Sequence, residues 1–331
     1  MKLQYGILGM VLVSGAAFAH DEAAEGIQVG GYVDARYTWG KVSEGARTNK
    51  FSLAEGAVYV GKRVGATRVF IDAGLNAGLN PTATGLSSLT LQQAYVANAS
   101  DAGFSWKAGR FDGIFGWQPN DSGHYWLSGR GLLQEGLPAY HQGLLFGYNF
   151  SDMMSLQVLA GLDNAQVGAV GAATASNASR NMDYPKWGVK LDSKMDAFDL
   201  GLGFQIEKAD AGEGNKWDLD LVAGTKFADY DFKAIFVMGK ENKDAKSTMG
   251  FGAQLGGMFT DSLSGVARVE WAKRAEKDTM LAMTVGPQFH LEKGFVVKAD
   301  YSLMLPGGDA NKDAAGDNTE HAINVAAVYD F

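Results

Sequence analysis

Apolar and polar residues alternate along most of the chain from Ile27 onward. The segment 198–207 is typical: Phe198, Leu202 and Phe204 share one parity, whereas small or polar residues occupy the other. Successive side chains of a β-strand point to opposite faces of the sheet, so this pattern predicts a strand with one apolar and one polar face. No helical period competes with it over a long stretch. We therefore predict an all-β fold.

Sixteen runs of this kind follow one another. They begin near residues 27, 51, 67, 89, 104, 143, 154, 185, 198, 216, 230, 248, 263, 279, 295 and 321. The second run is the least regular, because its parity slips at Glu55 and Gly56, as at a β-bulge. Short turns rich in Asp, Ser and Gly alternate with longer loops, which is typical of an up-and-down meander. The even number of strands places both termini on the short-turn side.

Contact with lipid explains why one parity is apolar. Its aromatic residues gather near the turns, as Phe104 and Phe227 do, and near the long loops, as Trp187 and Trp271 do. Two such bands match the aromatic girdles of a membrane barrel. A soluble sandwich would also alternate, but it would bury its apolar face in one thin core. Because no backbone donor can stay unpaired in lipid, the sheet must close. The pattern predicts a porin-like transmembrane antiparallel β-barrel of about 16 strands.

The composition excludes several other classes of protein. The absence of cysteine among the 331 residues rules out disulfide scaffolds, Cys-type zinc sites and thiol catalysis. The formal charge of −8 argues against a nucleic-acid partner, which needs a basic face. A mean hydropathy of −0.11 excludes a bundle of membrane helices. We expect neither a cofactor nor a metal, because the histidines lack metal-ligand spacing.

The first 19 residues have the layout of a secretory signal peptide. Lys2 precedes a short apolar run, and the segment ends in the small-residue pattern of Ala17 and Ala19. We expect a signal peptide over 1–19, a short lead-in over 20–25, and a single barrel over 26–331.

Charged residues of both signs occupy the polar parity, which faces the interior of the predicted barrel. In a dry core they would be costly unless they were well paired. A barrel of this size is wide enough for an aqueous channel, which removes most of that cost. The wall residues that we expect to line the channel are Asp34, Arg36, Arg68, Asp72 and Lys107.

The longest connection, 113–142, is rich in aromatic residues and leucine, which would be costly if they were left in water. By analogy with porins, we expect this third long loop to fold into the barrel and narrow it. The expected constriction brings Asp121, Arg130 and Glu135 of the loop opposite Arg36, Arg68 and Arg110 of the wall. Two alternatives stay open: the loop packs over the mouth or on a neighbouring subunit, or the arginines pair with Asp34 and Asp72 and set no selectivity. The sequence also leaves open the sign of ion selectivity.

Several stretches resemble the OmpL-like family of β-barrel porins of Gram-negative outer membranes. They lie within residues 90–165 and are QAYV at 93–96, KAGRFD at 107–112, SGRGLL at 128–133, PAYHQG at 138–143 and GLDN at 161–164. The terminal Phe331, which follows alternating apolar residues, resembles the assembly signal of outer-membrane barrels. The resemblance implies an outer-membrane location, with both termini in the periplasm, and a porin-like role. It transfers no functional residues.

These observations predict an outer-membrane porin, not an enzyme, with a water-filled channel for passive diffusion of ions and small hydrophilic solutes. The expected partners are outer-membrane lipids, these solutes, the barrel-assembly machinery through Phe331, and further copies of the chain in a homotrimer. One rival is a barrel enzyme of the lipase or protease type; His321 and the loop serines Ser87, Ser88 and Ser122 are present, but their spacing gives no triad. The other rival is a structural or adhesive surface barrel, which would have longer loops.

Overall fold

The computed structural model describes most of the chain. The described residues are 26–41, 47–75, 89–100, 102–118, 127–128, 131–134, 137–162, 185–208, 214–240, 247–273, 279–292, 294–307 and 319–331. Residues 1–25, which carry the expected signal peptide and lead-in, lie outside them.

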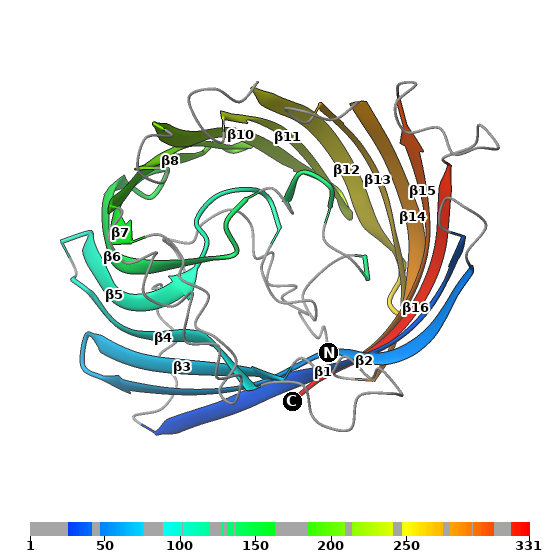
Figure 1. Cartoon of the computed structure of the whole chain (residues 1–331). Coiled ribbons are helices and arrows are strands. Elements are labelled where there is room, and N and C mark those ends of the chain that lie inside the picture. The colour runs from blue at the N-terminus through cyan, green and yellow to red at the C-terminus, as the bar shows by residue number, and fades with distance from the viewer. Residues whose placement is uncertain are drawn as a thin grey trace, which may run out of the picture.

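The described residues form sixteen antiparallel strands that close into one barrel, with β1 paired to β16 (Figure 1). The strands are β1 (Ile27–Lys41), β2 (Arg47–Val64), β3 (Thr67–Leu75), β4 (Leu89–Ala99), β5 (Phe104–Asp112), β6 (Tyr140–Ser151), β7 (Met154–Leu162), β8 (Pro185–Lys194), β9 (Asp199–Lys208), β10 (Asn215–Phe227), β11 (Tyr230–Lys240), β12 (Thr248–Thr260), β13 (Leu263–Lys273), β14 (Thr279–Glu292), β15 (Phe295–Pro306) and β16 (Glu320–Asp330). Each predicted run is a strand, and the observed starts lie within four residues of the predicted ones. The predicted fold class is confirmed. No helix among the described residues is long and apolar enough to span a membrane.

The predicted irregularity in the second strand is a β-bulge. Asp34 pairs with Glu55, whereas Ala35 pairs with Leu53, so Ala54 is an extra residue on β2. Because side chains alternate strictly along a strand, one extra residue exchanges the inward and outward parities beyond it. After the bulge it is the odd-numbered residues of β2, such as Ala57, that are buried inside the barrel.

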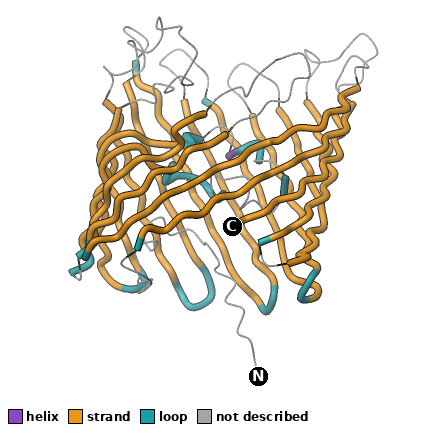
Figure 2. Tube along the Cα trace, turned by 90° about the horizontal axis from the view of Figure 1, so that it is seen from below, coloured by secondary structure: helices purple, strands orange, loops and turns teal. Residues whose placement is uncertain are grey.

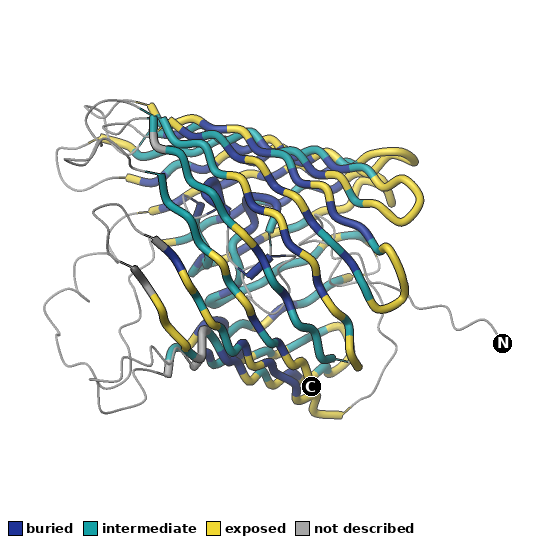
Figure 3. The backbone as a smooth tube through the Cα atoms, turned by 90° about the vertical axis from the view of Figure 1, so that its right-hand side faces the viewer, coloured by how far each residue is buried: buried dark blue, intermediate teal, exposed yellow. Residues whose placement is uncertain are grey.

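The barrel carries its apolar side chains outside and most of its polar ones inside. On β8, Trp187, Val189 and Leu191 are exposed, whereas Lys190 and Asp192 between them are buried. Figure 3 shows the same alternation of exposed and buried residues along the other strands. A soluble fold would place these residues the other way round, so the arrangement fits a wall between lipid and a polar interior.

The short turns lie at one end of the barrel, and the strand ends that lead into the long connections lie at the other (Figure 2). The first described strand starts at the short-turn end, because Ile27 pairs with Lys62 beside the turn at Gly65. The last strand finishes at the same end, where the Asp330 amide donates to the Gly294 carbonyl at 2.8 Å. The arrangement agrees with the prediction from an even number of strands.

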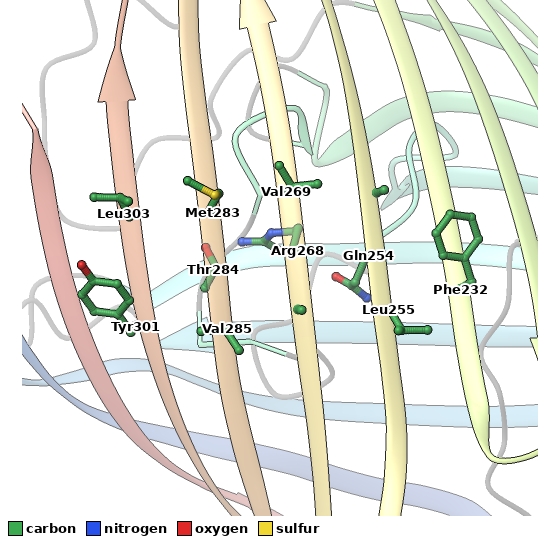
Figure 4. Close-up of a pocket in the computed structure, with 12 residues that line it drawn as sticks. Phe232, Gln254, Leu255, Arg268, Val269, Met283, Thr284, Val285, Tyr301 and Leu303 are labelled. Carbon is green, nitrogen blue, oxygen red and sulfur yellow. The ribbon is translucent and has the colours of Figure 1, made fainter.

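A hollow of about 530 Å³ interrupts the outer face between β11 and β15 (Figure 4). It occurs where Ala253 and Ala267 lie among much larger neighbours. The larger apolar residues that line it are Phe232, Leu255, Val269, Met283, Val285, Tyr301 and Leu303. The hollow is apolar and belongs to the face that we expect to contact lipid.

Candidate functional site

Inward-facing charges are concentrated on the wall from β8 to β15, and most of those cations lie beside carboxylates. Lys186 Nζ lies 3.1 Å from Glu207 Oε2, and Arg268 Nε lies 3.2 Å from Glu270 Oε2. Side chains of both pairs are buried. Pairing reduces the cost of placing these ions inside the barrel.

The inner wall also has an apolar patch, which alternation along the strands did not predict. Leu145, Leu159, Val222 and Ile235 come from β6, β7, β10 and β11, and all four are buried inside the barrel. They form one hydrophobic cluster with residues of the long connection between β5 and β6. The connection contributes Ile114, Phe115, Trp117, Leu132, Leu133 and Leu137. The wall is therefore apolar inside where the connection packs against it.

Inward glycines make room for the large side chains of this connection. A Cβ atom at Gly188 on β8 would lie 3.0 Å from Phe115 Cζ, and one at Gly252 on β12 would lie 3.2 Å from Trp117 Cη2. A Cβ atom at Gly250 would likewise meet the side chain of Leu133. Both distances are tighter than ordinary van der Waals contact, so a larger residue would push the connection away from the wall.

Backbone amides of the connection are held by carboxylates of the wall. The Gly116 amide donates to Asp220 Oδ2 on β10 at 3.2 Å. The amides of Leu132 and Leu133 donate to the two oxygens of Glu270 on β13, at 2.9 and 3.2 Å. The Ser128 amide donates to Asp300 Oδ2 on β15 at 2.9 Å. The described parts of the connection thus follow the inner wall from β10 to β15, inside the ring of strands (Figure 1).

Glu270 should be the strongest single anchor, because one buried carboxylate accepts two backbone amides. In a Leu132→Cys background, Glu270→Ala should raise the rate of maleimide labelling about tenfold, since hydrogen bonds to a charged group contribute about 1.5–3 kcal/mol each. The chain has no native cysteine, so the label is unique. Glu207→Ala is the matched control, because Glu207 pairs with Lys186 and Lys216 on the wall. Equal labelling rates in the two variants would contradict the anchoring role.

The loop members of the expected constriction, Asp121, Arg130 and Glu135, lie outside the described residues. On the wall, Arg36 Nη2 lies 2.7 Å from Asp34 Oδ2, and Asp34 is buried. Arg36 thus pairs with Asp34, and whether it also contributes to selectivity stays a prediction. Asp72 accepts a hydrogen bond from Gln93 Nε2 at 3.5 Å.

Arg110 is placed differently from Arg36 and Arg68. Arg110 pairs in register with Ala94 and Gln142, on the parity opposite to Lys107 and Phe111. Its guanidinium lies over the ring of Tyr140, 4.8 Å from the centroid, and its Nε donates to the Gln92 carbonyl at 2.9 Å. Gly109, which precedes Arg110, has a φ of +130°, so alternation along β5 does not by itself fix the direction of Arg110, and its place in the constriction stays a prediction.

The wall arginines also lie too far apart to share one constriction. Arg36 is opposite Ser52 of β2, whereas Arg68 is opposite Arg63 of the same strand. At roughly 3.3 Å per residue, positions 52 and 63 are more than about 30 Å apart along β2. Arg68 instead shares a level of the wall with Arg63 and Lys107. Arg63 was not among the expected channel residues, because its inward parity follows only from the bulge at Ala54.

The described residues contain no group of three or more His, Cys, Asp or Glu side chains that could hold a metal ion.

The comparisons with known proteins agree with this geometry. The family described as "Putative beta-barrel porin-2, OmpL-like" matches residues 26–331. The chain belongs to this family. The resemblance predicted from residues 90–165 is thereby confirmed, and it extends over the whole described barrel. The chain is a porin-like barrel, as predicted.

Solved structures with the same fold include a porin and other outer-membrane proteins. An anion-selective porin from Comamonas acidovorans is 13% identical, with a TM-score of 0.67 over 92% of this chain and 99% of that one. OprB from Pseudomonas putida is 12% identical, with a TM-score of 0.70 over 93% of this chain and 94% of that one. A trimer form of OmpT from Vibrio cholerae is 11% identical, with a TM-score of 0.57 over 92% of this chain and 99% of that one. At these identities the likeness concerns the fold. No curated protein matches the chain.

Proposed function

We propose that this OmpL-like barrel forms a water-filled channel in the Gram-negative outer membrane, through which ions and small hydrophilic solutes diffuse passively. The observation that carries the proposal is the inverted distribution of side chains. Lipid suits the exposed leucines and aromatic residues of the outer face, and water suits the charged residues within. A sixteen-stranded barrel is wide enough to leave an aqueous path.

The connection 113–142 supplies the narrowing of this channel in our proposal. Its described parts lie inside the ring and are held on one side of it, by the apolar patch and by Asp220, Glu270 and Asp300. The solute path would then run between the connection and the opposite wall, where β2 to β5 lie. Arg68 and Lys107 are on that wall and remain our candidates for contact with solutes, together with Asp34, Asp72 and Arg36.

The orientation and the partners are further parts of the proposal. We assign the short-turn end, and with it both termini, to the periplasm. The position of Phe331 supports its proposed role in assembly. Its amide donates to the Gly31 carbonyl at 2.9 Å and its carbonyl accepts from the Gly31 amide at 3.1 Å, where the first and last strands meet. The apolar outer face fits outer-membrane lipid. A homotrimer stays a prediction. Light scattering of the detergent-solubilised protein measures its oligomeric state.

Planar lipid bilayers test the channel directly. Refolded protein should produce stepwise increases of current in potassium chloride, and protein unfolded by heat should produce none. Radiolabelled phospholipid and a fluorescent peptide, added to the same preparation, assay the enzyme alternative. Folded protein that inserts without conductance steps would contradict the proposal.

A further inference from the structure

The hollow on the outer face between β11 and β15 lies along two rows of residues that cross the strands (Figure 4). Neighbours within each row are paired in register. One row consists of Ala253, Val269, Met283 and Leu303. The other row is two residues nearer to the short turns and consists of Phe232, Leu255, Ala267, Val285 and Tyr301. The hollow is therefore an elongated groove across five strands.

Backbone and two alanines form the floor of the hollow. Between the rows, Gln254, Arg268 and Thr284 are buried and belong to the inward parity. The rows are about 7 Å apart, which is the length of two residues of a strand. Ala253 and Ala267 have the smallest side chains of the two rows, and they leave a volume of about 530 Å³. Pockets that bind small ligands have volumes of about 300–1,000 Å³.

The hollow rises obliquely towards the long-loop end of the barrel. Phe232 lies two residues after the start of β11, beside a short turn. At the other side, Leu303 pairs with His321, the second residue of β16, whose start follows a long connection. The rise is expected, because strands of a membrane barrel are tilted by about 35–45°.

The length of this rise matches one leaflet of a bilayer. Strands lie about 4.8 Å apart, so the path from β11 to β16 is about 24 Å long. At a tilt of about 35–45° it rises by about 14–17 Å. Half of a hydrocarbon core of about 30 Å is about 15 Å. A chain that follows the hollow would thus run from the middle of the membrane to its surface.

A polar pair lies at the long-loop end of the hollow. Tyr301 lines the hollow, and its hydroxyl shares a hydrogen bond of 2.6 Å with Nδ1 of His321. His321 is itself partly exposed. When the Tyr301 hydroxyl donates to Nδ1, Nε2 carries the imidazole proton and can donate to a phosphate oxygen. The apolar hollow therefore ends beside a group that can bind a phosphate.

A lipid acyl chain fits this shape better than a second copy of the protein does. A flexible hydrocarbon chain can follow a groove that crosses five strands of a curved wall. The outer face of a second closed barrel is convex, as this one is, so it would touch only a few strands at a time. Since the bilayer is as apolar as the hollow, close packing and contact with the head group decide which lipid is retained.

We propose that the hollow binds one acyl chain of a membrane lipid from the leaflet at the long-loop end, with a phosphate of its head group beside His321. The inference goes beyond the channel function. It requires the barrel to lie in a membrane, but it does not require the barrel to conduct.

Native mass spectrometry of protein refolded in detergent tests the hollow, with dipalmitoyl phosphatidylglycerol as the probe. The wild type should retain one lipid per chain. The double variant Ala253→Phe and Ala267→Phe should reduce the lipid-bound fraction at least about fivefold, because two rings fill the space of the acyl chain. Its single-channel conductance should equal that of the wild type, since both changes lie on the outer face.

The matched control is Ala160→Phe on β7. Ala160 belongs to the outer face, where it pairs with Leu144 and Trp187. The control should bind the lipid as the wild type does. Heat-modified migration in gels establishes that each variant is folded.

The contact with the phosphate has a test of its own. His321→Ala should weaken the binding of phosphatidylglycerol about threefold, because one hydrogen bond is lost. It should leave unchanged the binding of dipalmitoylglycerol, which has the same acyl chains and no phosphate. Equal effects on the two lipids would overturn the role of His321.

Two results would overturn the lipid site itself. One is equal lipid binding by the double variant and the Ala160→Phe control. The other is a double variant that loses oligomeric mass while its lipid binding is unchanged, because the hollow would then be a contact between copies of the chain. Both results leave the channel intact, whereas wild-type protein that binds the lipid without conducting would refute the channel and leave the lipid site.

Discussion

Replacing both Trp117 and Leu133 with alanine should raise single-channel conductance about twofold, since a released loop leaves a wider path for ions. Both side chains are buried against the inner face of β12, at Gly252 and Gly250. Large-to-small changes at buried sites cost about 3–5 kcal/mol for Trp and 2–5 kcal/mol for Leu. The strands do not depend on this packing, because their backbone hydrogen bonds close the ring independently. We therefore expect the connection to leave the wall while the barrel stays folded.

The control for this experiment is the pair Trp187→Ala and Leu191→Ala. It deletes the same atoms from the outer face of β8, where both side chains are exposed. Its conductance should equal that of the wild type. The measurement is the single-channel current, together with the rate at which uncharged polyethylene glycols of increasing size enter the channel. A folded Trp117 and Leu133 variant with wild-type conductance would show that the connection does not narrow the path.

The second large effect concerns the lipid-facing surface. Leu202→Arg should reduce the free energy of unfolding in lipid vesicles by about 2–4 kcal/mol, because Leu202 lies near the middle of β9 and points outward. The same substitution at Met195, which is equally exposed in the turn before β9, should cost at most about 1 kcal/mol. Exposed fractions of 46% and 45% make the two sites comparable except in depth.

Urea titration of the protein in vesicles, followed by tryptophan fluorescence, measures the two free energies. Equal losses for Leu202→Arg and Met195→Arg would mean that depth in a membrane does not matter. The outer face of the barrel would then not be a lipid-facing surface.

Alternation alone predicted the number of strands, their starts and the outward direction of the apolar parity. Alternation predicts this much because side chains point to the two faces of a strand in turn, so the face of one residue fixes the faces of all the others. It also predicted the bulge in β2, but not the consequence for Arg63, whose direction depends on an extra residue nine positions earlier. Arg110 was chosen by residue type, and its register opposite Ala94 does not bring it to the level of Arg36.

The apolar patch inside the barrel could not be predicted in this way. Val222 lies between Leu221 and Ala223, so β10 is apolar on both faces there and alternation gives no signal. Whether an inward Val222 or Leu159 is tolerated depends on what covers it. Here the cover comes from connection residues between Ile114 and Leu137, which lie more than twenty positions before Leu159 and Val222 in the sequence.

The sequence by itself determined a closed, lipid-facing barrel, because strand periodicity and the requirement to pair every backbone donor are local rules that hold for each strand in turn. Only the tertiary structure decided which inward carboxylates bind the long connection and which cations lie at one level of the wall. The packing of the long connection engages Asp220, Glu270 and Asp300, and the register across three strand pairs brings Arg63 to the level of Lys107. Both are relations between distant segments, and no property of either segment alone specifies them.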